Sequence, residues 1–289
     1  MEAKSIKTDF KLIVENVRNQ FLLIASNEPD HFDQRDMEMV KSNDWWTERF
    51  VKVNNGNERD SLNQMLNAFR WRKSFGVNDR ALNDAPHEFI KGAAMFPHGF
   101  DHKSRPVVYL RAKMYQKIQR LNTIFQQFAT GIIEHVDRLA GRKGFVVVFD
   151  STGMGWRNFD IDFLQFIHQL FQHYYPCGVR SYIVYNLPKM LRPIWKLSKL
   201  LVGSSIRVFH FCNSAEELSQ FIPNDNILYY MGGESYDDFT EYEGSQGAPM
   251  ARQLAPKLGY SKEEVDKFFA MFEEQIRDTE KLLEPTKKR

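Results

Sequence analysis

Residues 145–150 read Phe145-Val146-Val147-Val148-Phe149-Asp150, a run of five apolar residues that ends at a carboxylate. An unbroken apolar run with β-branched residues at its centre predicts a strand buried on both faces, as in a parallel sheet. Segments of helical period lie before and after this run, and further strands are expected at 106–112, 181–186 and 206–211. Strands that alternate with helices predict βαβ units and a mostly parallel sheet.

The regions on either side of this sheet are expected to be helical. Four helical segments are predicted within the first 75 residues, so residues 1–85 are expected to form an N-terminal helical bundle. Residues 86–240 would form the sheet domain, with a turn at 97–102 and a last strand and turn at 229–233. Residues 241–289 are expected to be a linker and a C-terminal helix that opens at a capping box, Ser261 with Glu264.

The composition is that of an ordinary globular chain, with 289 residues of which 43% are hydrophobic and 26% are charged. A formal net charge of +2 gives no global field for nucleic acid, so we expect no nucleic-acid partner. Cys177 and Cys212 give neither a disulfide framework nor zinc spacing. No apolar run approaches the roughly 20 residues that span a bilayer, and the first residues do not resemble a signal peptide. We therefore expect a cytoplasmic protein.

Signatures of enzymes are missing at the ends of the predicted strands. Gly153 and Gly155 follow a strand, but no third glycine completes a dinucleotide loop, and Trp156 with Arg157 would crowd a pyrophosphate. No phosphate-binding loop and no nucleophile elbow is present. For Asp150, bracing a turn is favoured over chemistry. We expect no catalytic residue, no cofactor and no metal site, and hence no enzyme.

An aromatic stripe follows Asp150. Seven large apolar residues between Phe159 and Tyr174 recur at helical spacing. Core packing and the lining of a cavity for an apolar ligand use the same kinds of side chain, so periodicity alone leaves both interpretations open.

A basic amphipathic segment lies further along the chain, at 188–202. Four cations at spacings of 3, 4 and 3 share one side of a helix, and these are Lys189, Arg192, Lys196 and Lys199. A basic stripe near Trp195 and Leu201 is the composition of a helix that lies in a membrane interface. A solvated face over a buried one is the alternative interpretation.

The order of several motifs resembles that of one family. The motifs, in chain order, are Trp71-Arg72-Lys73, Phe145–Asp150 with Gly153, His173-Tyr174-Tyr175-Pro176, Asn186-Leu187-Pro188, Trp195 with Lys199, Arg207, and Met231-Gly232-Gly233. Over residues 5–235 this series resembles a CRAL-TRIO domain with its N-terminal helical segment, the family of phosphatidylinositol-transfer, tocopherol-transfer and retinaldehyde-binding proteins. The N-terminal half is most similar to the CRAL-TRIO module of motile-sperm-domain-containing proteins.

The resemblance implies an α/β fold: an N-terminal helical bundle, a CRAL-TRIO-type mostly parallel sheet with helices that enclose an apolar pocket, and a C-terminal helix. Residues expected to line the lipid pocket are Tyr109, Phe149, Phe163, Phe166, Phe171, Tyr175 and Tyr185. Residues expected in the gate that covers the pocket and touches membrane are Lys189, Arg192, Trp195, Lys196, Lys199 and Leu201. Arg207 falls on a position that contacts the headgroup phosphate in phosphoinositide-binding members.

The sequence departs from the phosphoinositide-transfer pattern at several positions. Asn54 and Asn55 stand where those members carry an Arg-Lys pair, and Cys177 stands where they carry a glutamate. Gly155 and Arg157 replace the small hydroxyl residues that help to bind choline lipid. One of three headgroup elements is retained, which argues against specific phosphatidylinositol exchange and leaves a hydrophobic ligand or another phospholipid open.

Together these features predict a non-enzymatic protein that binds a hydrophobic lipid or phospholipid and transfers it between membranes. Its expected partners are the lipid ligand and an anionic membrane surface, which it would meet as a peripheral protein on endomembranes. The alternative is a scaffold that keeps the CRAL-TRIO fold and binds membrane or a protein partner without a lipid cargo.

Overall fold

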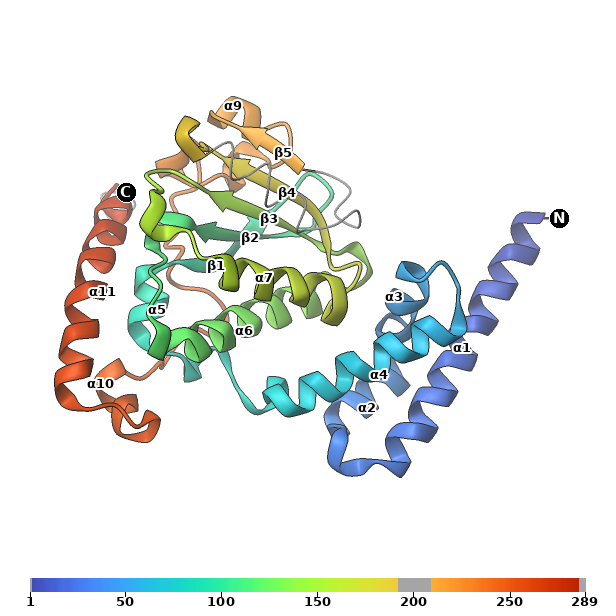
Figure 1. Ribbon diagram of the computed structural model, residues 1–289. Coiled ribbons are helices and arrows are strands. Elements are labelled where there is room, and N and C mark those ends of the chain that lie inside the picture. Colours follow the sequence, from blue (N-terminus) through green and yellow to red (C-terminus); the bar gives the residue numbers. More distant parts are fainter. Residues whose placement is uncertain (1, 192–208, 286–289) are drawn as a thin grey trace. The chain divides into compact units, whose positions relative to one another are not determined.

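The computed structural model describes residues 2–191 and 209–285, and it divides into two compact units (Figure 1). The helical unit comprises Met1–Arg80 together with Gln165–Val179, and the sheet unit comprises Ala81–Leu164 together with Arg180–Arg289. The expected domains differ from these units in two respects. Residues 165–179 group with the N-terminal helices, and residues 241–289 group with the sheet.

The helical unit contains the four N-terminal helices that the apolar periodicity predicts. They are α1 (Glu2–Asn27), α2 (Gln34–Ser42), α3 (Trp45–Val53) and α4 (Glu58–Phe75). Asp33 caps α2 by accepting a hydrogen bond from the Arg35 amide, and Asn57 caps α4 in the same way from Asp60. The apolar faces meet in one core, in which Phe21 and Phe69 are almost fully buried.

The sheet unit is built on a mostly parallel five-stranded sheet, as predicted. Its strands follow chain order, β1 (Met95–Phe100), β2 (Pro106–Arg111), β3 (Phe145–Asp150), β4 (Val179–Tyr185) and β5 (Phe209–Cys212). β2 and β3 are parallel, as are β4 and β5, whereas β1 runs antiparallel to β2. The apolar run 145–150 is β3, at the centre of the sheet.

Two local predictions were wrong. Residues 97–102 were expected to be a turn, but Met95–Phe100 is the edge strand β1, where Pro97 lies beside an irregularity in the register. An edge strand tolerates a proline because not every amide has to donate to a neighbouring strand. The last strand expected near residue 229 is instead a 3₁₀ turn, Tyr229–Met231, which ends at Gly232 with a φ of 91°.

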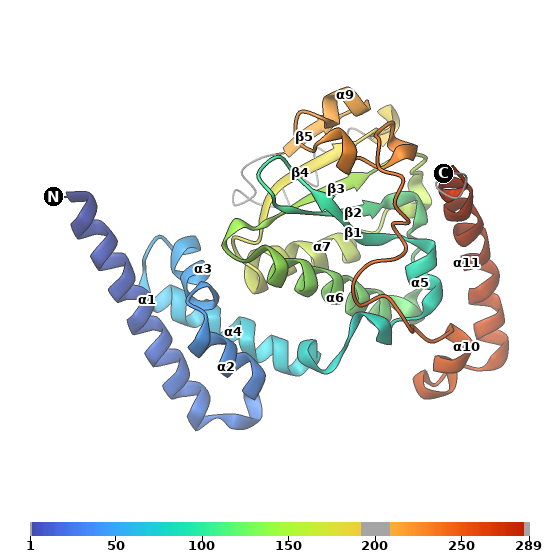
Figure 2. The same cartoon turned by 180° about the vertical axis from the view of Figure 1, so that it is seen from behind.

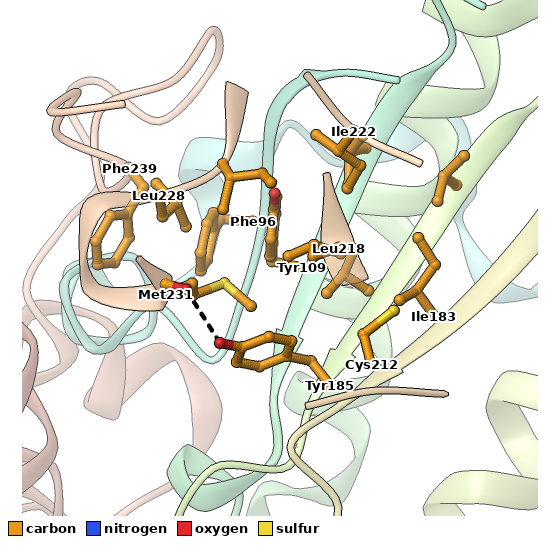
Figure 3. Packing of buried hydrophobic residues seen from close by; sticks show 14 of the residues in the cluster. Phe96, Tyr109, Ile183, Tyr185, Cys212, Leu218, Ile222, Leu228, Met231 and Phe239 are labelled. Atoms are coloured by element: carbon orange, nitrogen blue, oxygen red, sulfur yellow. Dashed lines mark hydrogen bonds between the residues drawn. The ribbon is translucent and has the colours of Figure 1, made fainter. Parts of the chain in front are cut away.

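Different parts of the chain cover the two faces of the sheet (Figures 1 and 2). Helix α6 (Asn122–Ala140) lies on one face, and the segment 213–240, which includes α9 (Ala215–Leu218), lies on the other. We call these the helix-side face and the tail-side face. Successive side chains of a strand point to opposite faces of the sheet. On the tail-side face, the strand residues pack into one core with residues of the segment 218–239 (Figure 3). These strand residues are Val107, Tyr109, Val146, Val148, Ile183, Tyr185 and Cys212.

The C-terminal region belongs to the sheet unit. Helix α11 (Lys262–Leu283) begins at the predicted capping box, with the Ser261 hydroxyl accepting from the Glu264 amide. It packs against α5 (His87–Gly92), and Leu283 at its end enters the tail-side core. Within the region expected to be a linker, α10 (Ala251–Leu254) forms one further helical turn. Among the described helices, none has the length and apolar character needed to cross a bilayer.

Candidate functional site

Large apolar side chains on the helix-side face are less buried than their position in a sheet would suggest. Val108, Val147 and Val184 on this face are buried. Four larger side chains on the same face keep accessible surface, and these are Leu110, Phe149, Tyr182 and Phe209. On the tail-side face, the seven core residues named above are at most 8% exposed, while His210 of β5 is partly buried. The larger side chains of the helix-side face are therefore incompletely buried.

Tyr182 and Phe209 continue this set of incompletely buried side chains onto β4 and β5. Tyr182 retains accessible surface, yet burial raises its pKa well above the usual range. Desolvation disfavours the charged phenolate, so the Tyr182 hydroxyl keeps its proton at neutral pH. The Tyr182 ring stacks on that of Phe209, at a centroid distance of 5.1 Å, which continues the apolar lining onto β5.

Phe163 is an expected pocket residue that lies outside the sheet, on a helix. It lies in the first turns of α7 (Ile161–Gln169), and its ring stacks on Tyr115 at 4.8 Å. The Tyr115 hydroxyl donates to Asp160 at 2.6 Å, and Asp160 also accepts from the amide of Asp162 at 3.0 Å. Burial and the bond to this carboxylate raise the pKa of Tyr115, which holds the hydroxyl as a donor. These bonds fix the start of α7 and orient Phe163.

Tyr109 and Tyr185, also expected to line the pocket, lie on the opposite face from Phe149. Tyr109 is fully buried, and the Tyr185 hydroxyl donates to the Met231 carbonyl at 3.0 Å (Figure 3). No single cavity on one face can be lined by all three side chains. Three residues that were not among the expected pocket residues lie on the same face as Phe149, and these are Leu110, Tyr182 and Phe209. Leu110 pairs with Phe149 in the register of β2 and β3, a relationship that the sequence does not contain.

The other three expected pocket residues belong to the helical unit. Phe171 and Tyr175 are buried there, and Phe166 lies 6.0 Å from Phe75. The Tyr175 hydroxyl accepts a hydrogen bond from Arg72 at 3.2 Å. The guanidinium of Arg49 lies over the Tyr175 ring, 5.9 Å from the ring centre. Tyr175 therefore supports the packing of this unit.

At the carboxyl end of β3, Asp150 braces the turn, as predicted. One carboxylate oxygen accepts from the Thr152 amide at 2.9 Å, and the other accepts from the Tyr230 hydroxyl at 3.1 Å. Arg111, its register partner on β2, donates instead to Thr279 of α11 at 2.9 Å. Each of these buried polar groups serves structure, and the arrangement contains no nucleophile paired with a base.

Comparison with known proteins identifies the fold. Residues 90–233 match the CRAL/TRIO domain. The protein belongs to the CRAL-TRIO family. The crystal structure of Sfh5 superposes with a TM-score of 0.63 over 87% of this chain and 96% of that one, at 16% identity, which supports the fold.

Two CRAL-TRIO relatives are similar in sequence. The CRAL-TRIO domain-containing protein C3H8.02 of Schizosaccharomyces pombe is 26% identical over 68% of this chain and 47% of its own length. The phosphatidylinositol transfer protein CSR1 of Eremothecium gossypii is 24% identical over 68% of this chain and 49% of its own length. The match thus spans about half the length of each of these relatives.

The positions that depart from the phosphoinositide-transfer pattern of CRAL-TRIO proteins have local partners. Asn54 donates to the Phe50 carbonyl at 3.0 Å and to the Gln64 amide oxygen at 2.8 Å. Cys177, with a φ of 60°, donates its thiol to the Arg49 carbonyl at 3.7 Å. Both side chains serve the packing of the helical unit.

Most of the segment expected to form a gate lies outside the described residues. This applies to Arg192, Trp195, Lys196, Lys199 and Leu201, and to the expected phosphate-binding Arg207. The described start of the segment is a 3₁₀ turn, Lys189–Leu191, in which Leu191 is buried while Lys189 and Met190 are exposed. Leu191 packs in a cluster with Phe149 and Val184, so the described start of segment 188–202 lies against the helix-side face.

Proposed function

We propose that the protein binds one hydrophobic lipid or phospholipid on the helix-side face and carries it between membranes without chemical change. The observation that carries this proposal is the incomplete burial of Leu110, Phe149, Tyr182 and Phe209. Large apolar side chains that are incompletely buried favour an apolar ligand, because burying the rest of their surface releases water from it.

The named relatives support the same function. One is called a phosphatidylinositol transfer protein, and another, from Schizosaccharomyces pombe, is called Sec14 cytosolic factor; it is 25% identical over 64% of this chain and 72% of its own length. By extension, we propose that this protein works in the cytoplasm and visits endomembranes. The local bonds of Asn54 and Cys177 favour a ligand other than phosphatidylinositol.

The proposal also assigns a role to segment 188–202, which we expect to act as the gate. Segment 188–202 would cover the bound lipid and meet an anionic membrane through its basic stripe, with Arg207 close to a ligand phosphate. Support comes from the exposed Lys189 and the buried Leu191, which place cationic and apolar character on different sides at the start of this segment.

Lipid uptake by pocket variants tests the proposal. Phe149→Trp adds volume on the helix-side face while remaining apolar, so it should lower the amount of fluorescent phospholipid or retinoid taken up from donor vesicles. Leu139→Trp, at a 57% exposed position of α6, is the matched control and should behave as the wild type. Equal uptake by all three proteins would contradict a pocket at Phe149, and no uptake by the wild type would overturn the proposed function.

A scaffold without cargo is the second candidate. The departures at Asn54, Asn55 and Cys177 favour it, because the family's headgroup contacts are absent at these positions. Such a scaffold would bind vesicles with unchanged affinity in Phe149→Trp and would release no lipid on solvent extraction.

A further inference from the structure

The turn that follows β3 exposes a tryptophan. Trp156 is 58% exposed, although its neighbour Met154 is 8% exposed and packs in the cluster of Phe149 and Leu191. An exposed indole is mostly apolar surface with one N–H donor, which suits an interface that is apolar on one side and wet on the other. No step of the proposed lipid binding requires Trp156.

This turn is held rigidly. Asn158 accepts from the Gly155 amide at 3.0 Å and donates to the carbonyls of Lys113 and Tyr115 at 3.0 and 2.8 Å. Asp150 holds the start of the same turn through the Thr152 amide. Trp156 is therefore presented at a defined place, at little further cost in conformational entropy.

A second exposed apolar side chain comes from the adjacent turn. The Ser151 amide donates to the Tyr185 carbonyl at 2.9 Å, and the Asn186 side chain donates to the Thr152 hydroxyl at 3.2 Å. These bonds bring the turn 151–158 beside the turn 186–191, in which Met190 is 60% exposed. Both turns lie at the same end of the sheet in the two views of Figures 1 and 2.

Positive charge flanks the two apolar side chains. Arg157 follows Trp156 in the chain, and Lys189 precedes Met190. Both cations are exposed, and neither forms an ion pair within the described residues. The nearby carboxylates Asp160 and Asp162 are already paired with Lys117. Exposed apolar tips beside exposed cations are complementary to the interface of an anionic bilayer.

We infer that Trp156 and Met190, with Arg157 and Lys189, form a membrane-docking surface that inserts its apolar tips into the interface of an anionic membrane. The inference rests on the proposed lipid-carrying function. It adds Trp156 and Arg157 to the start of the gate segment, where Lys189 and Met190 lie, so the turn after β3 would orient the protein on the bilayer.

Vesicle binding by the full chain tests this surface. Sedimentation with vesicles of phosphatidylcholine and phosphatidylserine should show about tenfold weaker binding for Trp156→Ala, the loss expected when one aromatic side chain no longer inserts. Leu139→Ala, at an equally exposed leucine of α6, should bind as the wild type. Arg157→Glu should weaken binding to these vesicles and leave the residual binding to pure phosphatidylcholine unchanged.

Loading with lipid from cyclodextrin, in the absence of vesicles, separates this inference from the proposed function. Normal loading with weak vesicle binding in Trp156→Ala supports the docking surface. Wild-type vesicle binding in Trp156→Ala overturns it, and so does a parallel loss of loading, which would place Trp156 in the pocket. A wild-type protein that binds vesicles through Trp156 but loads no lipid would refute the proposed function alone.

Discussion

Arg72 and Tyr175 lie about a hundred residues apart in sequence, yet the Arg72 guanidinium donates to the Tyr175 hydroxyl at 3.2 Å. The same guanidinium makes two hydrogen bonds of 2.9 Å to Asp36, and both partners of this ion pair are 1% exposed. Beside it, the rings of Trp71 and Tyr174 stack at 3.9 Å. The motifs Trp71-Arg72-Lys73 and His173-Tyr174-Tyr175-Pro176 thus contact each other. This contact joins residues 165–179 to the N-terminal helices.

Replacing Arg72 should therefore destabilise the helical unit. Arg72→Leu leaves the Asp36 carboxylate buried without its partner, and we expect the free energy of unfolding to fall by about 3 to 5 kcal/mol. Chemical denaturation followed by circular dichroism measures this loss. Arg70→Leu is the control, because the ion pair of Arg70 with Glu28 is more than a third exposed and should contribute less than ~1 kcal/mol. Similar losses in the two variants would contradict the role given to Arg72.

Thr279 anchors α11 to the sheet. Its hydroxyl accepts from Arg111 at 2.9 Å and donates to the Gly92 carbonyl at 2.9 Å, in a fully buried position. Thr279→Val keeps the shape but leaves both partners short of a hydrogen bond, so we expect a loss of about 2 kcal/mol and faster amide exchange along α11. Glu280→Gln, at the next and exposed position, should change neither quantity. Unchanged exchange in Thr279→Val would show that α11 is held by its apolar face alone.

His98 should make stability depend on pH. Its ring nitrogen lies 3.1 Å from the Ser235 hydroxyl, and burial lowers its pKa below the ordinary 6.5, against an opposing effect of Asp237. The unfolded chain therefore binds a proton at His98 more readily than the folded chain. The contribution of neutral His98 to the free energy of unfolding is fully present above about pH 6.5 and is lost as the pH falls towards the folded pKa. Thermal unfolding from pH 7.5 to 5 should show a steeper decline for the wild type than for His98→Asn. Parallel curves would refute the prediction.

Charge reversal of the basic stripe tests the gate. Changing all four cations to glutamate should weaken binding to anionic vesicles at least a thousandfold, since each cation adds about 1 kcal/mol near such a surface and each glutamate adds repulsion. The residues changed are Lys189, Arg192, Lys196 and Lys199. A control with the same change in net charge reverses four exposed lysines of the C-terminal region, Lys257, Lys262, Lys267 and Lys281. Equal loss in both proteins would mean that net charge, and not this stripe, governs binding.

Features decided by local sequence were predicted well. The unbroken apolar run of β3 and the capping box at Ser261 correspond to elements close to their expected places, because burial on both faces and helix capping each have a short-range signature. The motif series identified the CRAL-TRIO family. The narrower similarity to motile-sperm-domain proteins stays a prediction.

Features decided by register and tertiary pairing could not be predicted. Tyr109 and Leu110 differ by one position, and only their pairing with Val148 and Phe149 shows which of them faces the helix side. The same holds for Tyr182 and Tyr185 on β4. Likewise, nothing local to Tyr175 reveals that it belongs with the N-terminal helices, because its partner Arg72 lies far away in the chain.

The most direct test of lipid binding is to identify the lipid that co-purifies with the protein. Purified from cells and analysed by native mass spectrometry and by organic extraction, the full chain should carry one lipid molecule per chain, and Phe149→Trp should carry less. Wild-type protein that contains no stoichiometric lipid and acquires none from vesicles would contradict the central claim that the helix-side face holds a lipid.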